Sequence, residues 1–384
     1  MFFCKVFVGI FLLKVLNFVF LIVYIACLLL CFFQYTLGMV LGWLRRVLIV
    51  LLVLDLTLIV FLAINPPRKK ITLAGSSTVF PLAHRWGDLY MDYYPNVSVE
   101  VTGGGSGLGI LAAGEHTVDI GMASHPLEPD QRRKFPNLVE IPIALDGVAI
   151  VANKNVNDSL KLTREMIVSI FSGKIKTWEE FSKMFNVNIK AKGDIIVCVR
   201  ADKSGTTDVF SKWLSLDPSW GLGHGEVISW PKSRRFVSGN GNQEVLINVR
   251  NNPNAIGYVG LAYTQESGVV VAEILNPSIG EYVAPSADSV RRAAEKTVSM
   301  VNESLFDANI SGAYPIARAL YFIVDGKYVK SKVHVVKFIA WVLDPKGGQI
   351  AEIVRGVGYV EISGTILHRM ALLIINEFCS RGSG

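Results

Sequence analysis

Two long apolar runs open the chain. Residues 6–33 are almost wholly apolar, with two polar interruptions, and residues 47–64 form a second run with Asp55 inside it. A helix rises ~1.5 Å per residue and needs ~20 mostly apolar residues to cross a bilayer. We therefore expect residues 1–70 to be a membrane anchor with two transmembrane helices, over about 6–33 and 47–64.

Alternatives remain for this segment. A cleaved signal peptide has an apolar core of ~7–15 residues and a small-residue cleavage site. The first run is longer and no such site follows it, which favours two retained helices. Basic residues stand on both sides of the second run, so the positive-inside rule leaves orientation open. Asp55 either contacts another membrane subunit or is an acid tolerated against the first helix.

From residue 71 onward, short β-branched segments alternate with segments of helical periodicity. Strands are expected at 71–75, 97–102, 118–122, 141–152, 195–200, 255–260 and 319–324. Helices are expected at 79–94, 110–114, 166–171, 178–181, 208–214, 245–250, 333–343 and 348–354. Repeated strand–loop–helix units without hairpin signals predict an α/β fold with largely parallel sheets.

Charge is distributed unevenly along the 384 residues. Seven of the 38 Lys/Arg but only one of the 32 Asp/Glu lie in residues 1–70, so the last 314 residues carry 31 of each. The net charge of +6 therefore belongs to the anchor, which argues against a polybasic nucleic-acid binder. A hydrophobic content of 51% excludes a disordered chain. The downstream part is long enough for two domains.

The cysteine and histidine residues are not spaced as metal ligands or disulfide partners usually are. Three of the five cysteines lie in the first 31 residues, which leaves Cys198 and Cys379, and the six histidines are scattered singly. We expect no disulfide framework, no structural or catalytic metal and no cofactor. No nucleophile–histidine–acid set is recognisable, and Gly173-Lys174 is followed by Ile175 rather than the Ser or Thr of a P-loop. The sequence does not predict an enzyme.

Loops rich in Ser, Thr and Gly follow three of the expected strands and open helices, at 75–78, 105–107 and 204–207. A helix start exposes backbone amides and the positive end of the helix dipole. Small residues let an anion approach those amides, and ligands of open α/β sheets bind at the carboxyl ends of strands. Each loop alone is equally well a helix cap. Several such loops meeting would form an oxyanion site.

The order of these loops resembles the phosphate-binding proteins of ABC transporters, the PstS-like family. The matching stretches are GSSTVFPL at 75–82, GGSG at 104–107, DIGMAS at 119–124, FSGKI with Trp at 171–178, RADKSGT at 200–206, GNGNQ at 239–243, AIGYVG at 255–260 and YPIAR at 314–318. The resemblance covers about 71–360, and the RADKSGT stretch is its most specific part. The apolar segment lies outside the match and departs from the commoner secreted or lipid-anchored pattern.

This resemblance implies a two-lobed type II periplasmic-binding-protein fold that closes over phosphate without a metal. We expect lobe one at 71–147 plus 312–384 and lobe two at 148–311. The protein would bind inorganic phosphate and deliver it to ABC permease subunits. It would be held at the cell membrane with its soluble part on the extracytoplasmic side, and it would not bind nucleic acid.

Site residues follow by position from the same resemblance. Arg200 would be the guanidinium ligand of phosphate, with Asp202 as its orienting partner. Further hydroxyl or amide donors are expected from Ser77, Thr78, Phe80, Ser106, Ser204, Gly205 and Thr206. The donors of the first loop vary among relatives, so either Ser77 or Thr78 is expected to act there together with the Phe80 amide.

Asp119 is the residue that we expect to distinguish phosphate from sulfate. A carboxylate beside a bound anion makes sense if it accepts a hydrogen bond from a protonated ligand oxygen, which phosphate has and sulfate lacks. Without that proton two negative charges would face each other in a dry cleft, at a cost of several kcal/mol. The alternative is a strand-end acid that caps a neighbouring turn. His125 follows in the same loop, and we expect it to make local hydrogen bonds.

Two other functions remain open. The ligand could be another tetrahedral oxyanion such as sulfate, molybdate or tungstate. The chain could also be a membrane-linked phosphate-sensing ectodomain, although residues 1–70 leave no room for a cytoplasmic output domain. A phosphoester-cleaving enzyme is least supported, because the sequence offers no metal cluster and no nucleophile.

Overall fold

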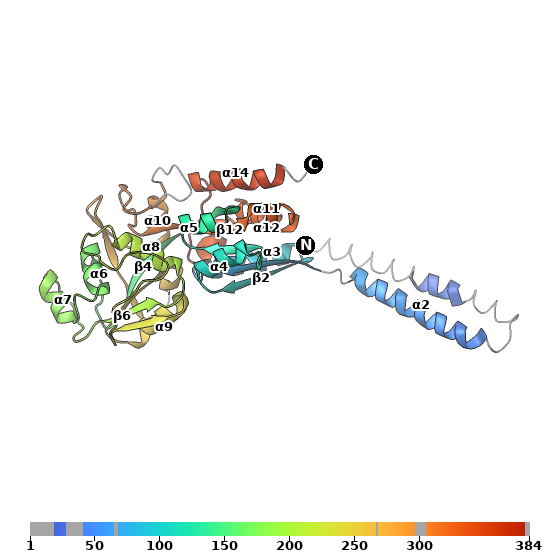
Figure 1. Ribbon diagram of the computed structural model, residues 1–384, viewed down its shortest axis with the longest axis horizontal. Coiled ribbons are helices and arrows are strands. Elements are labelled where there is room, and N and C mark those ends of the chain that lie inside the picture. Colours follow the sequence, from blue (N-terminus) through green and yellow to red (C-terminus); the bar gives the residue numbers. More distant parts are fainter. Residues whose placement is uncertain (1–18, 28–40, 65–67, 266–267, 296–304, 381–384) are drawn as a thin grey trace. The chain divides into compact units, whose positions relative to one another are not determined.

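The computed structural model describes residues 19–27, 41–64, 68–265, 268–295 and 305–380 (Figure 1). The chain divides into two compact units, Met1–Pro67 and Arg68–Gly384. The second unit contains every sheet of the described chain.

In the first unit, residues 19–27 are helical and helix α2 spans Leu41–Ile64. Within the part of the chain that the structure describes, no helix is both long and apolar enough to cross a membrane. The two predicted transmembrane helices are therefore not confirmed. Much of the first one, residues 6–18 and 28–33, lies outside the described residues.

The second unit is built on a mixed sheet of nine strands in the order β2-β1-β3-β12-β4-β8-β6-β7, with β9 also pairing with β4. The strands are β1 (Lys69–Gly75), β2 (Val97–Gly103), β3 (Ile120–Ala123), β4 (Leu138–Asn153), β6 (Ile196–Arg200), β7 (Phe236–Gly239), β8 (Ala255–Gly260), β9 (Val269–Val271) and β12 (Ala317–Asp325). A second sheet has the order β11-β10-β5, from β5 (Lys161–Leu162), β10 (Glu273–Asn276) and β11 (Glu281–Val283).

Strand β4 joins two lobes. Its first part pairs with β12 as far as Gly147, and from Val148 it pairs with β8. We call the part built on β2, β1, β3, β12 and the start of β4 the first lobe, and the part built on the rest of β4 with β8, β6, β7 and β9 the second lobe. Nearly every residue of β4 is buried, because helices cover both faces of the sheet there. The predicted boundaries 71–147 plus 312–384 and 148–311 stay a prediction.

Strand directions are only partly as predicted. Strands β1, β2 and β3 run parallel, and so do β6, β7 and β8. In contrast, β12 is antiparallel to β3 and β4, and β4 is antiparallel to β8 and β9. The strands that pass between the lobes cause this mixture, since β4 and β12 cross in opposite directions.

Helices pack on both lobes. The first lobe has α3 (Phe80–Tyr93), α4 (Ser106–Gly114), α5 (Pro129–Lys134), α11 (Gly326–Lys330), α12 (Val333–Leu343), α13 (Ala351–Gly356) and α14 (Ile366–Ser380). The second has α6 (Arg164–Phe171), α7 (Trp178–Phe185), α8 (Gly205–Leu214), α9 (Gly241–Asn251), the 3-10 helix η1 (Leu261–Gln265) and α10 (Ala287–Ala293). Periodicity had not predicted α5, α10, α11 or α14, nor the small sheet.

One large apolar core runs through both lobes, with Trp86 and Phe338 in the first lobe and Trp213 and Tyr258 in the second. A smaller cluster lies where α9 packs on β8 and β6. The loops that follow β1, β2 and β6 lead into α3, α4 and α8, which pack on the large core. The site described next is formed by those loops.

Candidate functional site

Hydroxyl groups from the two lobes meet at the ends of β1 and β6. The Thr78 and Thr206 hydroxyls lie 3.0 Å apart, and the Asn242 side-chain amide donates to Thr78 at 2.9 Å. Thr78 follows β1 of the first lobe, whereas Thr206 is in the first turn of α8 and Asn242 in the first turn of α9. All three side chains are buried. The predicted convergence of separate helix starts therefore holds for these loops.

The loop after β1 differs in detail from a simple helix cap. Ser76 accepts hydrogen bonds from the Thr78 and Val79 amides at 3.2 and 3.4 Å, and α3 begins only at Phe80. The hydroxyls of Ser77 and Thr78 are thereby left to face the second lobe. The Phe80 amide, a predicted ligand donor, instead donates to the Ser76 carbonyl at 3.0 Å.

Serine side chains from the first lobe surround the start of α8. The Ser106 and Ser124 hydroxyls lie 3.2 Å apart, and the Ser124 amide donates to Ser106 at 3.1 Å. A Cβ atom on Gly205 would lie 2.5 Å from the Ser124 hydroxyl oxygen and in contact with that of Ser106. Position 205 is therefore glycine because the opposite lobe approaches its backbone. Ser204 acts as the N-cap of α8, with its oxygen accepting from the Thr206 and Thr207 amides.

Arg200 ends β6 and points across the gap. Its guanidinium forms a bidentate pair with Asp202, as predicted from the motif, and donates to the Ser77 hydroxyl at 3.2 Å. Burial acts to raise the pKa of Asp202, but the hydrogen bond and charge of Arg200 outweigh it and lower that pKa. The remaining nitrogen of Arg200, Nη1, is buried and has no hydrogen-bond partner among the described residues. An unpaired donor of this kind is costly unless a ligand occupies it.

Arg318 and Asp146 form a second buried pair that the sequence analysis did not assign. The guanidinium contacts the carboxylate at 2.7 and 2.9 Å, and its Nη2 also reaches the hydroxyls of Thr78 and Thr206 at 3.3 and 3.2 Å. These residues come from β12 and β4, the two strands shared by the lobes. Burial raises the pKa of Asp146 although Arg318 opposes the shift. Arg318 is the last residue of the YPIAR stretch, so the family resemblance included this arginine without giving it a role.

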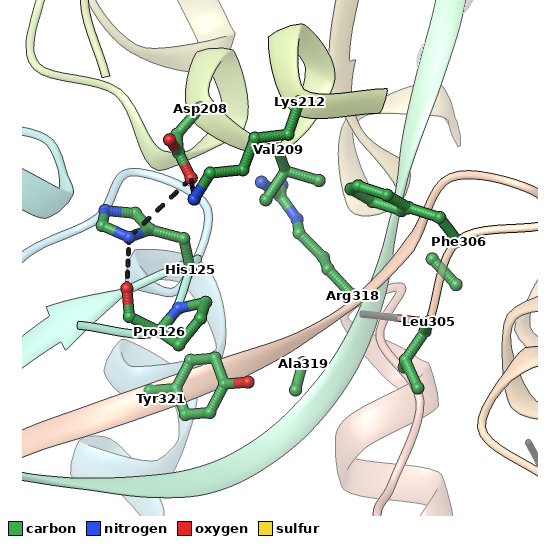
Figure 2. Close-up of a pocket in the computed structure, with 11 residues that line it drawn as sticks. His125, Pro126, Asp208, Val209, Lys212, Leu305, Phe306, Arg318, Ala319 and Tyr321 are labelled. Atoms are coloured by element: carbon green, nitrogen blue, oxygen red, sulfur yellow. Dashed lines mark hydrogen bonds and ion pairs between the residues drawn. The ribbon is translucent and has the colours of Figure 1, made fainter. Parts of the chain in front are cut away.

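Arg318 also lines a cavity of about 100 Å³ (Figure 2). Asp208 and Lys212 of α8 face into it, with His125 and Pro126 opposite and Tyr321 on the floor formed by β12. Arg318 therefore borders this cavity and also contacts Thr78 and Thr206, whose hydroxyls, with those of Ser106 and Ser124, we call the hydroxyl cluster.

Asp119 is not brought to this cluster. Its carboxylate accepts from the amide and hydroxyl of Thr72 at 2.9 and 3.0 Å and from Lys332 at 2.5 Å. Strand β1 rises ~3.3 Å per residue, so Thr72, the middle residue of β1, lies roughly 10 Å before Gly75, where the strand ends at the site. This position corrects the expectation that Asp119 faces a bound anion. It fits the alternative of a strand-end acid that satisfies neighbouring groups.

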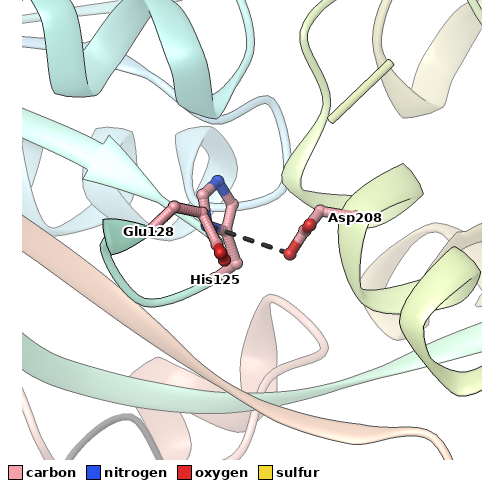
Figure 3. A group of neighbouring side chains, drawn as sticks. All are labelled: His125, Glu128 and Asp208. Carbon is pink, nitrogen blue, oxygen red and sulfur yellow. Dashed lines mark ion pairs between the residues drawn. The ribbon is translucent and has the colours of Figure 1, made fainter. Parts of the chain in front are cut away.

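One group of the described residues could hold a metal by distance alone: His125, Glu128 and Asp208, whose possible ligand atoms lie within 4.8 Å of one another (Figure 3). The ammonium of Lys212 already pairs with both Glu128 and Asp208. Because the ammonium of Lys212 already lies against both carboxylates, the group does not fit an additional metal ion.

The arrangement favours a small anion. Two guanidinium groups and several hydroxyls converge, while the nearby carboxylates are each committed to a cation: Asp202 to Arg200, Asp146 to Arg318, and Asp208 to Lys212. Charge-assisted hydrogen bonds from guanidinium groups are the strong ones for oxyanions.

Two lobes joined by crossing strands, with an anion-binding cluster between them, define the class of two-lobed binding proteins. A family model described as a PBP superfamily domain matches residues 63–346. The phosphate-binding protein PstS of Methanocaldococcus jannaschii is 30% identical over 312 residues, which cover 73% of this chain and 80% of the relative. The chain therefore belongs to the PBP superfamily and, within it, to the family of phosphate-binding proteins PstS.

Other comparisons agree. A PstS protein of Xylella fastidiosa is 30% identical, with 80% of this chain and 86% of the relative covered. Among solved structures, a putative phosphate ABC transporter substrate-binding protein of Clostridium perfringens has a TM-score of 0.58 at 23% identity, covering 77% of this chain and all of that one. At this identity the likeness shows the fold alone. The family is a class of substrate-binding receptors and not of enzymes.

Proposed function

We propose that this protein binds inorganic phosphate between its lobes and delivers it to an ABC permease. The observation that carries the proposal is the buried Nη1 of Arg200, which has no partner among the residues that the structure describes and lies beside hydroxyls from both lobes. The relatives from Methanocaldococcus jannaschii and Xylella fastidiosa are named phosphate-binding proteins, and the Clostridium perfringens structure is described as having bound phosphate. No bond-breaking step is part of this function.

Most of the predicted ligand residues remain in the proposed site. Arg200, oriented by Asp202, donates to the anion from one side. Hydroxyl and amide donors come from Ser77, Thr78, Ser106, Gly205 and Thr206, with Arg318 added from the structure. Ser204 supports the site by capping α8. Asp119 and the Phe80 amide are left out, because both groups already have partners elsewhere.

Lobe movement follows from these contacts. Thr78 and Thr206 now contact each other directly, and so do the Arg200 guanidinium and Ser77. A tetrahedral anion would replace such contacts by bridging the same donors. Binding would then proceed by entry into an open form and a hinge motion along β4 and β12.

We also propose that residues 1–70 hold the lobes at the cell membrane, on the extracytoplasmic side. The support is the apolar character of residues 6–33 and 47–64. Expression of the full chain, followed by alkaline extraction of membranes and protease protection, tests this. Release of the chain by alkaline carbonate would reject the anchor, and protection of the lobes in right-side-out vesicles would reject the orientation.

Calorimetric titration of the full chain in detergent tests phosphate binding. Arg200→Ala should weaken phosphate binding by about 100-fold or more, because it removes charge-assisted bonds worth ~1.5–3 kcal/mol each from a buried anion. Arg85→Ala, which removes an exposed arginine of α3, is the matched control and should leave the affinity unchanged. Absence of phosphate binding by the unaltered chain, or equal affinities for Arg200→Ala and Arg85→Ala, would reject the proposal.

A further inference from the structure

His125 forms a polar contact between the two lobes that the proposed function does not use. It follows β3 of the first lobe and is completely buried. Its Nε2 lies 2.9 Å from a carboxylate oxygen of Glu226, which belongs to the second lobe between α8 and β7. A Cβ atom on Gly205 would lie 2.7 Å from its ring carbon Cδ2, so the ring borders the start of α8.

The partners of the ring define its protonation. Nδ1 lies 2.6 Å from the carbonyl oxygen of Pro126, and Nε2 lies against the Glu226 carboxylate. Carbonyl and carboxylate oxygens accept hydrogen bonds and do not donate them. Both ring nitrogens must therefore carry a proton, so His125 is an imidazolium when both bonds are formed. A neutral ring would lose one of them.

Glu226 is held firmly in this position. Its own carbonyl accepts from the Ser204 amide at 3.0 Å, next to the N-terminus of α8. Its second carboxylate oxygen lies close to Gly107 of α4, where a Cβ atom would be 2.6 Å away. The carboxylate thus fits between two helix starts of the proposed site, and the His125 contact ties it to the first lobe.

Other charged groups surround the pair on each packed element. Helix α8 contributes Asp208, 3.9 Å from Nδ1, and Lys212, which pairs with Asp208 and with Glu128 at the start of α5. Strand β4 contributes Glu140, which is paired with Arg132 of α5, and β12 contributes Arg318. The acids outnumber the bases around the ring, which favours its charged form. Figure 3 shows two of these acids, Glu128 and Asp208, with His125.

The pKa follows the same balance. Burial by itself lowers the pKa of His125, but the hydrogen bond to Glu226 and the charges of Asp208 and Glu226 outweigh burial and raise it above its ordinary value. When the lobes separate, the ring loses Glu226 and returns towards the ordinary pKa. The closed form is therefore stabilised fully below the ordinary pKa, near 6.5, and loses this stabilisation as the pH rises through the raised pKa.

We propose that His125 is a positioning residue whose imidazolium latches the closed lobes through Glu226 and thereby makes phosphate binding depend on its proton. It acts through closure and not by contact with phosphate. This inference rests on the proposed function. It adds that His125 is protonated when the two lobes close around phosphate. Phosphate affinity should fall at high pH because His125 loses its proton, in addition to any effect of the titration of phosphate itself.

The test compares His125→Gln with the unaltered chain across pH, because phosphate itself titrates and only the ratio of affinities isolates the ring. We expect the unaltered chain to bind phosphate about 10-fold more tightly than His125→Gln at pH 6, with the ratio falling towards 1 by about pH 9. Glu226→Gln, which keeps the ring but removes its partner charge, should reproduce this profile. Combining both changes should add little to either one.

His84→Gln is the matched control, since His84 pairs with Asp88 on the exposed face of α3. It should leave phosphate affinity unchanged at every pH. A loss of phosphate affinity in His125→Gln that is constant with pH would show that the ring acts by packing, and it would reject the proposal. No loss of affinity at any pH would also reject it.

A second measurement separates this inference from the proposed function. The thermal midpoint of the phosphate-free chain should be lowered by His125→Gln more at pH 6 than at pH 9. If the chain binds no phosphate but this difference persists, only the proposed function fails. If phosphate binds but neither the midpoint nor the affinity shows the pH-dependent difference, only the latch fails.

Discussion

Two acidic side chains of the first lobe are each paired with a base, yet their surroundings differ. Asp146 lies in the middle of β4, fully buried, and pairs with Arg318 next to Thr78 and Thr206. Asp119 precedes β3 and pairs with Lys332, whose side chain is 31% exposed. The first pair lies where the lobes join, whereas Asp119 lies at the start of β3, beside the middle of β1.

The difference shows why a motif does not by itself place a side chain. Asp119 stands in a recognisable stretch, DIGMAS, whose last residue Ser124 does reach the hydroxyl cluster. A strand of four residues separates the two, so the start and the end of one motif lie at opposite edges of the sheet. Asp146 stands inside an apolar strand, where it carried no motif signal.

Asp146→Asn should have the largest effect. The change keeps the shape and the acceptor for the Leu261 amide but removes the charge opposite Arg318. Removal of one partner leaves a buried guanidinium unpaired, which should cost about 3–5 kcal/mol of unfolding free energy. Urea unfolding of the full chain in detergent measures this loss.

Asp158→Asn is its control, because the exposed pair of Asp158 with Lys190 lies on the surface of the second lobe. That change should cost at most about 1 kcal/mol. Equal losses for the two variants would show that the Asp146–Arg318 pair is not the buried joint described above.

Gly205→Ala tests how closely the lobes approach at the hydroxyl cluster. The added methyl group would meet the Ser106 and Ser124 hydroxyls and the His125 ring. Overpacking of this kind costs about 1–3 kcal/mol, so phosphate should bind roughly 10- to 100-fold more weakly, while the fold is kept. Titration calorimetry and circular dichroism measure the two quantities.

Gly221→Ala provides the matched change, since no atom lies within 4 Å of a Cβ built there. Its phosphate affinity should equal that of the unaltered chain. Unchanged affinity in Gly205→Ala would mean that the lobes bind phosphate without approaching at this position.

Much of the fold could be predicted from the sequence, because its signals are local. The β-branched runs gave β1, β2, β6 and β8 to within a few residues, and Ser/Thr/Gly loops marked the starts of α4 and α8. The direction of β12 could not be predicted in this way, since it depends on which strands pass between the lobes. Helix α14, which packs against α12 and β4, was also not predicted.

The site was also predicted only in part. Thr78, Ser106 and Thr206 were predicted by position from the family resemblance, and the Ser/Thr/Gly loops that contain them had indicated helix starts after strands. Arg318 and Asn242 lie in the YPIAR and GNGNQ stretches but were not assigned to the site, and Asp146 lies in no matched stretch; tertiary packing brings all three together. The His125 ring was expected to make local hydrogen bonds, and it does so with Pro126, but its bond to Glu226 spans 101 positions and has no local signal.

Asp119→Asn should have the smallest effect on phosphate binding. Because Asp119 pairs with Lys332 away from the cluster, phosphate and sulfate affinities should each stay within about 2-fold of the unaltered chain. Stability at neutral pH should fall by about 1 kcal/mol, as expected for a partly exposed pair.

Stability also gives the pH test of this pair. Burial lowers the pKa of Lys332, but the hydrogen bond and charge of Asp119 outweigh it and raise that pKa. The stability difference between the two proteins should therefore vanish as the pH rises through the raised pKa of Lys332. A tenfold loss of phosphate affinity, or tighter sulfate binding, would instead show that Asp119 reaches the ligand in the bound form. The sequence-based role of this carboxylate would then be restored, because discrimination against sulfate requires an acceptor that touches the ligand's proton.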